Sequence, residues 1–392
     1  MFGKNIKFKN FDLKKNRFNK KKQILNIYKN LIKEKNEVIL SLDKNYKDSF
    51  SKKIVKKLKK INHVLLIGMG GSILGAKAIY KFLNPKHKKF TFVDNFSNIP
   101  LHINNKKKIT LIISKSGNTL ETISNSNILI DKKNTNIFIT ENKKSYLMEL
   151  AHKLKSEIIH HNNFIGGRYS VLSEVGMLPA QLMGFKAEKF RRLNQLINKK
   201  YFINSLIQNV TNIFDLINKN KTNSIILNYD DKSNDLFNWY QQLVAESLGK
   251  KSKGILPVIS IMPRDNHSLM QYYLDGKKNH FFTFFFVREK NSKKIKNKNL
   301  LKTHSYLENK SLNEISFRQF TATEKVFKQK KIPYRSFIIN NRDEQTIGEL
   351  FTFFILETIL LGRAMKISPF DQPAVELIKK QTKKILISKK YF

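Results

Sequence analysis

The feature that most constrains the fold is an alternation of short apolar runs with amphipathic helical patterns, which occurs twice along the chain. In the first series the apolar runs lie at 63–70, 89–94, 108–114 and 135–140, and helical patterns follow most of them. Apolar runs of this length are typical of strands buried on both faces, and their alternation with helices indicates right-handed crossovers between parallel strands. The first half of the chain therefore predicts a doubly wound parallel sheet.

The same alternation starts again near residue 223. Apolar runs at 223–229, 254–263, 280–287 and 334–340 predict four more strands, and the pattern at 235–249 predicts a helix after the first of them. A second α/β sandwich unit follows from this repetition.

Helical patterns account for most of the remaining chain. Residues 1–60 read as a polar helical segment, and the stretch around 185–220 reads as a helical bridge between the two sheets. Two long helical patterns, 344–365 and 373–387, close the chain. We expect two α/β units with helical additions at both ends.

Composition excludes several classes of protein. The chain has 392 residues, 41% of them hydrophobic, which is enough for more than one domain. It has no cysteine, so disulfides and thiolate metal sites are excluded. The basic N-terminus lacks the apolar stretch of a secretory signal, and the apolar segment 347–362 is too short to span a bilayer and contains Glu349 and Glu357. We expect a cytoplasmic protein with no membrane partner.

The formal net charge of +44 raises the question of a nucleic-acid partner. The lysines are scattered along the chain and form no single basic arm, so we interpret them as solvated surface and expect no nucleic-acid function. Two stretches are free of lysine. Between Ser156 and Phe185 the only lysine or arginine is Arg168, and between Gly254 and Gly276 it is Arg264. In these two stretches a constraint other than exposure to solvent determines which residue types occur.

Two glycine- or hydroxyl-rich turns follow predicted strands. "IGMGGSILG" (67–75) lacks the dinucleotide-binding spacing, because residue 73 is Ile, but it places Ser72 at a helix N-terminus. "SKSGNT" (114–119) offers three hydroxyls, a glycine and a lysine at the start of the next helix. An N-cap needs only one hydroxyl, so this loop favours phosphate binding, although it is not a P-loop.

Three further stretches carry polar side chains for which a functional and a purely structural interpretation are both open. "GGRYSVLSEVGMLPA" (166–180) brings Arg168 after two glycines, and the alternative is a surface arginine on a tight turn. Gln242 and Glu246 are four residues apart on one helical face, and Glu246 lies near the C-terminal end, where the helix dipole disfavours a carboxylate. "RDNHSLMQ" (264–271) places His267 after a strand, where a lone histidine is usually structural. A fourth stretch, "FDQPAVELIKK" (370–380), spaces Gln372 and Lys379 seven residues apart, which predicts one helical face.

Taken in this order, the six stretches resemble the phosphoglucose isomerase family over roughly residues 60–385, most specifically in 166–180 and 370–380. The resemblance implies an α/β fold of two sugar-isomerase (SIS) domains, each a mostly parallel sheet in an αβα sandwich. The implied boundaries are an N-terminal helical segment 1–54, a first domain 55–200, a second domain 201–342, and C-terminal helices 343–392 that pack across both domains.

The resemblance also implies a reaction and a site. It implies reversible isomerisation of glucose 6-phosphate to fructose 6-phosphate, with Glu246 as the base that moves a proton between C2 and C1 and Arg168 stabilising the enediolate. His267 would open the sugar ring, assisted by Lys379, and would be donated across a homodimer interface. The implied substrate-binding residues are Gly71, Ser72, Ser114, Lys115, Ser116, Thr119, Gln242 and Gln372. The loop departs from the larger members of the family, which read SKTFTT where this chain reads SKSGNT.

The chemistry of such a reaction agrees with these residue types. A 1,2-proton shift through a cis-enediol needs one base that reaches both carbons and a fixed cation for the developing oxyanion. It is internally balanced, so no redox cofactor is required. A metal could replace the arginine, but the histidines of "IIHHNN" (158–163) lack a spaced acidic partner, and His160 and His161 would point to opposite faces of a strand. We expect neither metal nor cofactor.

Two other interpretations stay open from the residues. A sugar-phosphate sensor would share the phosphate loop, but it would have no use for a base and a ring-opening histidine. An isomerase that also accepts mannose 6-phosphate would share the active-site chemistry, and residue spacing does not separate it from a single-substrate enzyme.

Overall fold

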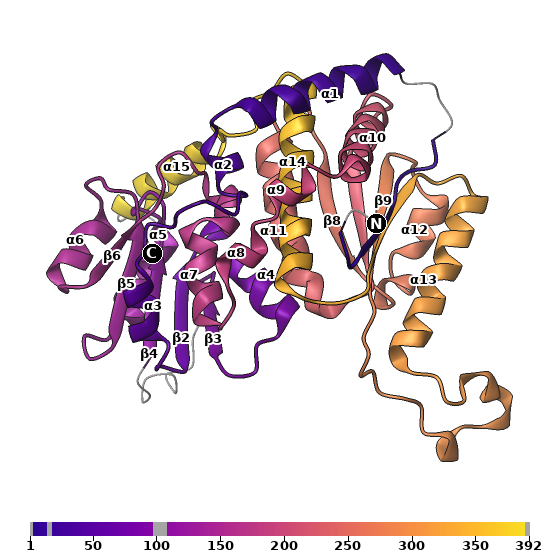
Figure 1. The fold of residues 1–392 in the computed structure, drawn as a ribbon, viewed down its shortest axis with the longest axis horizontal. Helices are drawn as coiled ribbons and strands as arrows, with labels where there is room; N and C mark the ends of the chain where they lie inside the picture. Colours follow the sequence, from indigo (N-terminus) through magenta and orange to yellow (C-terminus); the bar gives the residue numbers. More distant parts are fainter. Residues whose placement is uncertain (1–2, 14–17, 97–107, 389–392) are drawn as a thin grey trace.

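The computed structural model describes residues 3–13, 18–96 and 108–388 and contains two five-stranded sheets (Figure 1). The first sheet is parallel throughout, with the order β3-β2-β4-β5-β6. Its strands are β2 (His63–Gly68), β3 (Lys89–Val93), β4 (Lys108–Ile113), β5 (Thr135–Thr140) and β6 (Glu157–His160). The strands predicted at 63–70, 89–94, 108–114 and 135–140 are confirmed.

The second sheet has the order β1-β10-β9-β7-β8 and is parallel except for its edge strand β1, which is antiparallel to β10. Its strands are β1 (Ile6–Lys9), β7 (Asn223–Asn228), β8 (Leu256–Ile261), β9 (His280–Val287) and β10 (Tyr334–Ile339). The four strands predicted after residue 222 are confirmed, and each sheet is the mostly parallel sheet expected of its unit.

The interpretation of residues 1–60 as helical is wrong for β1. Ile6 and Phe8 are buried while Lys7 and Lys9 are exposed, which is the two-residue period of a strand with one covered face. Ile6 lies opposite Ile339 in the register, so this short segment finds its partner more than three hundred residues along the chain. Four residues are too few for the period to stand out among lysines and asparagines.

Helices cover both faces of each sheet, as expected for αβα sandwiches. On the first sheet Leu65 and Ile67 pack toward α5 (Leu120–Leu129) and α6 (Tyr146–Lys153), and Val64 and Leu66 pack toward α4 (Leu74–Leu83). On the second sheet one face meets α11 (Asn234–Leu248), and the other meets α12 (Met270–Asp275) and α13 (Leu312–Gln329). Successive residues of a strand therefore pack against the helix layers on opposite faces of the sheet.

One helix joins the two units. Nearly every residue of α14 (Glu344–Ala364) is buried, and the helix packs against α11, α10 (Lys200–Ile217), α8 (Ala187–Phe190) and α1 (Phe18–Lys33). A single hydrophobic cluster includes Leu66 of the first sheet, Phe285 of the second and Phe351 of α14. The remaining helices are α2 (Glu37–Leu40), α3 (Lys52–Leu58), α7 (Glu174–Leu182) and α9 (Leu193–Leu196).

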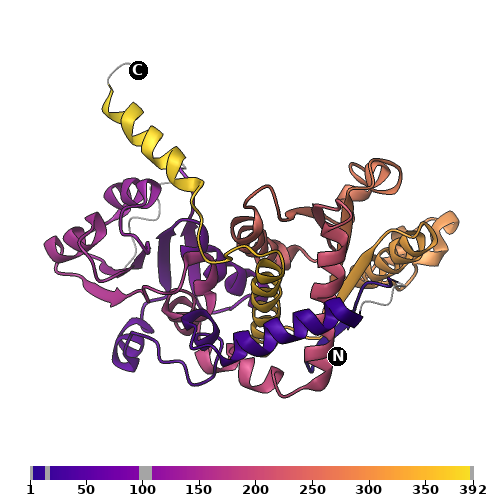
Figure 2. The same ribbon diagram turned by 90° about the horizontal axis from the view of Figure 1, so that it is seen from above.

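The last helix differs from all of these. α15 (Val375–Ile387) buries no side chain and projects away from the body of the molecule (Figure 2). Leu377, Ile378 and Leu386 are each about two-thirds exposed or more (67%, 71% and 66%). The expected C-terminal segment 343–392 ends in residues 389–392, which lie outside the described part of the chain. No helix within the described ranges is long and apolar enough to cross a membrane.

Candidate active site

A pocket of about 360 Å³ lies at the carboxyl ends of β2, β4 and β5, where helices from both units meet. This edge of a parallel sheet is where ligands bind in open α/β folds. The pocket walls come from the 3₁₀ turn η1 (Gly70–Ser72), the β4–α5 loop, the turn η3 (Gly167–Leu172), α11 and the residues around the start of α15. Its lining residues are Met69, Gly71, Ser72, Lys115, Ser116, Thr119, Glu141, Lys143, Gly167, Arg168, Gln242, Glu246, Gln372, Glu376 and Lys379.

Most of the predicted site residues meet in this pocket. Of the twelve, ten line it, and the two that do not are Ser114 and His267. The pocket therefore unites residues from separate sequence motifs.

The glycines of η1 are required by close contacts. Gly70 has φ +52°, and a Cβ there would lie 2.6 Å from Nε2 of Gln242. A Cβ on Gly71 would lie 2.1 Å from the carbonyl carbon of Gly167, so the two backbones touch. The glycines of "GMGG" and "GGR" thus let the turn η1 approach η3 and α11 around the pocket.

In the β4–α5 loop, Ser116 and Thr119 line the pocket. Ser114 is 2% exposed and lies behind the loop, where its Oγ is 2.9 Å from Oγ1 of Thr119. It therefore orients Thr119 and does not itself line the pocket. The Ser116 hydroxyl accepts a hydrogen bond from the backbone N–H of Asn118 at 3.2 Å.

Gly117 and Asn118, which distinguish this loop from the larger family members, pack against the next loop. Gly117 has φ +65°, and a Cβ there would lie 2.1 Å from Oγ of Ser145. The Asn118 side chain accepts a hydrogen bond from the backbone N–H of Tyr146 at 3.0 Å, at the start of α6. Both residues fasten the loop to its neighbour and leave the pocket side to Ser116 and Thr119.

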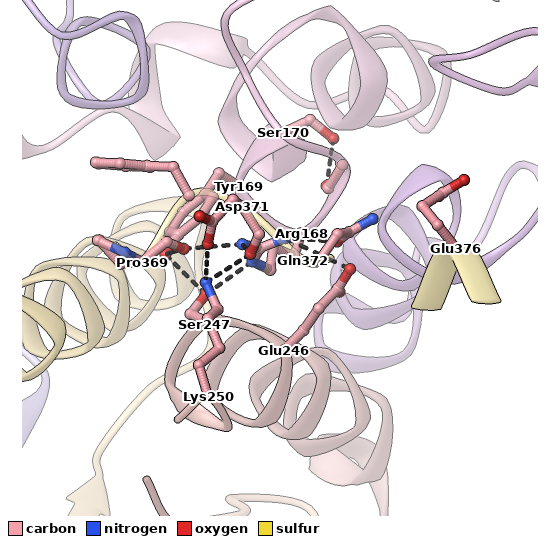
Figure 3. A network of polar contacts seen from close by, with 12 residues as sticks. Arg168, Tyr169, Ser170, Glu246, Ser247, Lys250, Pro369, Asp371, Gln372 and Glu376 are labelled. Atoms are coloured by element: carbon pink, nitrogen blue, oxygen red, sulfur yellow. Dashed lines mark hydrogen bonds and ion pairs between the residues drawn. The ribbon is translucent and has the colours of Figure 1, made fainter. Parts of the chain in front are cut away.

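Arg168 is the centre of a buried polar network (Figure 3). Only 3% of it is exposed, and its Nε donates to Ser247 Oγ at 2.7 Å while its Nη1 donates to Gln372 Oε1 at 2.7 Å. Its Nη2 donates to the carbonyl oxygens of Pro369 at 2.8 Å and Asp371 at 3.1 Å. The guanidinium thus fixes the segment before α15 as well as its own position.

Two neighbours support this network. Burial raises the pKa of Tyr169, so its phenol stays neutral and donates to the carbonyl oxygen of Pro369 at 3.0 Å. The ammonium of Lys250 donates to the carboxylate of Asp371 at 2.5 Å and to the carbonyl oxygen of Ser368 at 2.5 Å. The hydrogen bond from Lys250 lowers the pKa of the Asp371 carboxyl.

Glu246 lies in the last turn of α11, as its sequence position predicts, and its carboxylate meets a cation there. Oε1 of Glu246 is 3.4 Å from Nη1 of Arg168, which offsets the unfavourable end of the helix dipole. Gln242, one helical turn earlier, also lines the pocket, and its buried Oε1 has no hydrogen-bond partner in the described structure.

The prediction that Gln372 and Lys379 share a helical face is wrong. α15 begins at Val375, so Gln372 belongs to the preceding turn, which Arg168 holds. Pro373 follows directly and disfavours a helical conformation at Gln372. Lys379 is on the helix, where its ammonium donates to Glu376 Oε1 at 2.6 Å and lowers the pKa of that carboxyl. Both residues still line the pocket.

His267 lies outside the pocket. It follows the 3₁₀ turn η5 (Arg264–Asn266) beyond β8, in the second unit, and its side chain is exposed. Nothing within the described residues brings it to the pocket of its own chain.

Sequence reasoning missed the pocket residues Met69, Glu141, Lys143, Gly167 and Glu376. Glu141 and Lys143 follow β5 at the same sheet edge as the 114–119 loop, and this position was the available signal. Ser247 was missed as well, although it follows Glu246 directly, because its role rests on a contact with Arg168 that spans 79 residues.

Comparisons with known proteins point to one family. The model of the phosphoglucose isomerase family matches residues 15–256. The glucose-6-phosphate isomerase of Methanocaldococcus jannaschii is 31% identical over 382 residues, covering 91% of this chain and 92% of that protein. The glucose-6-phosphate isomerase of Mycoplasmopsis pulmonis is 32% identical over 361 residues, covering 84% of each chain.

Solved structures share the fold. A hypothetical protein from Thermus thermophilus superposes with a TM-score of 0.80 at 21% identity, covering 93% of this chain and 94% of that one. A glucose-6-phosphate isomerase from Chlamydia trachomatis superposes with a TM-score of 0.68 at 18% identity, covering 91% of this chain and 78% of that one. The family match, the relatives and the fold lead to one conclusion: the chain belongs to the phosphoglucose isomerase family.

Proposed function

We propose that this protein interconverts glucose 6-phosphate and fructose 6-phosphate. The observation that carries the proposal is the pairing of the Glu246 carboxylate with the Arg168 guanidinium, at 3.4 Å, in the same pocket as the hydroxyl-bearing loop 114–119. A base, a fixed cation and an anion-binding loop are the three parts that an aldose–ketose isomerisation of a sugar phosphate needs. The relatives from M. jannaschii and M. pulmonis carry the name of this activity.

The 114–119 loop binds the unreactive end of the substrate. Ser116 and Thr119 donate hydroxyl hydrogen bonds to the phosphate, and the N-terminus of α5 adds its backbone N–H groups. Anchoring the phosphate in this way places C1 and C2 near Glu246 and lowers the entropic part of the barrier.

Glu246 transfers the proton. Its carboxylate takes a proton from C2 of the open-chain aldose, the C1–C2 bond becomes the double bond of a cis-enediol, and the same carboxylate returns a proton to C1. Oxygen protons are exchanged between O1 and O2, so the reaction balances without an oxidant or reductant. Arg168 stabilises the negative charge on the enediolate oxygens, a contribution of about 2.7–4 kcal/mol for comparable electrostatic donors.

Ring opening is assigned to Lys379 and to His267 of a second copy. The chain's own His267 is exposed and does not line the pocket, which supports a supply from a partner subunit. α15 carries Lys379 on one side and exposed apolar side chains such as Leu377 and Ile378 on others, a surface that a second subunit would cover. The homodimer is therefore part of the proposal, and the cytoplasmic location remains a prediction from the sequence.

A coupled spectrophotometric assay on the purified protein tests the reaction. Glu246→Gln removes the base and is expected to lower kcat by about 10²–10⁴-fold. The matched control is Glu149→Gln on α6, where the carboxylate is exposed (64%) and away from the pocket, and it should retain wild-type activity. Wild-type turnover no higher than that of E246Q would overturn the proposal.

A further inference from the structure

Two charged residues outside the predicted set, Glu141 and Lys143, lie on the turn after β5, beside the 114–119 loop. Glu141 is 5% exposed, and its carboxylate is ion-paired with Lys143 through Oε2 and with Lys115 through Oε1, the latter at 3.4 Å. All three residues line the pocket together with Ser116 and Thr119. One buried carboxylate therefore holds two lysines at the end of the pocket where the proposed function places the phosphate.

Backbone hydrogen bonds hold this turn against the loop. The N–H of Glu141 donates to the carbonyl oxygen of Lys115 at 3.1 Å, and the hydroxyl of Thr140 donates to the same oxygen at 3.3 Å. The N–H of Lys143 donates to the carbonyl oxygen of Glu141 at 2.9 Å. The backbone at Lys143 is thus fixed relative to the 114–119 loop, and only its side chain is left to adjust.

The two lysines differ in how many partners they already have. The ammonium of Lys115 also donates to the carbonyl oxygen of Asn163 at 2.8 Å. The side chain of Lys143 is 57% exposed, and within the described residues its ammonium meets no acceptor other than Glu141. An ammonium has three N–H donors, so Lys143 keeps donors for an incoming anion.

The carboxylate explains why two like charges can stay at the same place. Two neighbouring ammonium groups repel each other, and a buried carboxylate is unfavourable unless cations pair with it. Together Glu141, Lys115 and Lys143 carry a formal charge of +1, from two cations and one anion. A phosphate monoester carries about −1.5 to −2 at pH 7, so its charge complements the cluster.

We propose that Lys143 binds the phosphate group of the substrate as a second cation beside Lys115, and that Glu141 is a positioning residue that holds both ammonium groups at the pocket. This inference rests on the proposed function, because it takes the anion at the loop to be the phosphate of a sugar phosphate. Lys143 contributes to binding and takes no part in the proton transfer at C1 and C2.

Lys143→Gln tests the binding role, with Lys144→Gln as the matched control. K143Q should raise the KM for fructose 6-phosphate about tenfold and leave kcat within about twofold, because it removes a charge-assisted contact far from the reacting carbons. The inhibition constant for inorganic phosphate should rise by the same factor. Lys144 lies next in the chain, is 91% exposed and does not line the pocket, so K144Q makes the same change of net charge with no expected effect.

Lys143→Arg provides the rescue, because it keeps a cation with several donors at the same position. K143R should restore most of the affinity that K143Q loses, for both the substrate and inorganic phosphate. An unchanged KM and an unchanged phosphate inhibition constant in K143Q would overturn the inference.

Glu141→Gln tests the positioning role through the direction of its effect. Removing a carboxylate makes the pocket more positive, so net charge alone predicts a lower KM for a phosphate ester. Positioning predicts the opposite, a KM raised by about threefold or more, because the two ammonium groups lose the group that holds them. A fall in KM would refute the positioning role, and thermal unfolding of E141Q shows whether the fold is kept.

Calorimetric titration separates this inference from the proposed function. If the wild-type protein binds fructose 6-phosphate but does not isomerise it, the proposed function fails while the comparison of K143Q with wild type still tests Lys143. If wild type is active and the affinity of K143Q is unchanged, only the inference fails.

Discussion

Arg168→Lys should lower kcat about a hundredfold or more, because the geometry of this guanidinium is specific. Four acceptors surround it, at 2.7 Å (Ser247 Oγ), 2.7 Å (Gln372 Oε1), 2.8 Å (Pro369 O) and 3.1 Å (Asp371 O). A single ammonium on an unbranched stem cannot occupy the positions of Nε, Nη1 and Nη2 at once. Losing the fixed cation beside Glu246 should cost about 2.7–4 kcal/mol in the transition state, a decrease in kcat of about 10²–10³-fold.

A second arginine serves to separate the effect of R168K on stability from its effect on kcat. Hydrogen bonds to charged groups contribute about 1.5–3 kcal/mol each, so R168K should lose a few kcal/mol in urea unfolding. Arg191 is a close match: it is 4% exposed and donates to the carbonyl oxygens of Leu172, at the far end of η3, and Tyr46, each at 3.0 Å. R191K should lose similar stability and keep kcat within about threefold, since Arg191 does not line the pocket. Equal losses of kcat in R168K and R191K would refute the reasoning, because they would show a general loosening of η3.

Three further outcomes follow from the structure and the proposed dimer. Mixing Glu246→Gln subunits with His267→Ala subunits, each inactive alone, should restore about a quarter of wild-type activity. This fraction follows because half the dimers are mixed and each mixed dimer has one intact site. No recovery after verified subunit exchange would refute a shared site. Gly117→Ala should raise the KM for the sugar phosphate and destabilise the protein more than Gly184→Ala does. Both glycines have positive φ, but only at Gly117 would a Cβ collide, 2.1 Å from Oγ of Ser145. Equal unfolding midpoints of the two variants would contradict this. Burial lowers the pKa of His161 to about 4 from 6.5, so the unfolded chain takes up the proton first as the pH falls. Protonation of His161 in the unfolded chain therefore removes up to about 3 kcal/mol of stability between pH 6.5 and 4. Urea titrations of His161→Gln should lack that part of the pH dependence.

Much of the fold could be predicted because the strands are buried on both faces. β9 is buried at all eight positions, and such a run stands out even in a lysine-rich sequence. β1 was missed because it is four residues long and covered on one side only, so its period of two competes with the spacing of nearby apolar residues. Both outcomes depend on the length of the apolar pattern, which is eight residues in β9 and four in β1.

The site divides along a different line. Residues that line the pocket, such as Arg168 and Glu246, could be found from motifs because the proposed chemistry restricts the residue types. Residues that support the pocket from behind could not, since Ser247, which accepts from Arg168, and Ser145, which lies against Gly117, are ordinary serines whose importance comes from contacts with distant parts of the chain. The departure of Gly117 and Asn118 from the larger family members also belongs here, because both residues contact the neighbouring loop at Ser145 and Tyr146.

The position of Glu246 implies that the proposed reaction needs both α/β units. α11, which carries Glu246, follows β7 of the second sheet, yet it packs on α4 of the first unit. Arg168 comes from the first unit and reaches Ser247 on α11, while Trp239 of α11 donates back to the carbonyl oxygen of Arg168 at 3.2 Å. The 3.4 Å separation of the Glu246 carboxylate and the Arg168 guanidinium is therefore set across the junction of the two units, and one hydrophobic cluster includes residues of both sheets there. Because the barrier of the proposed reaction depends on that separation, any change that shifts the units against each other should reduce kcat before it unfolds either sheet.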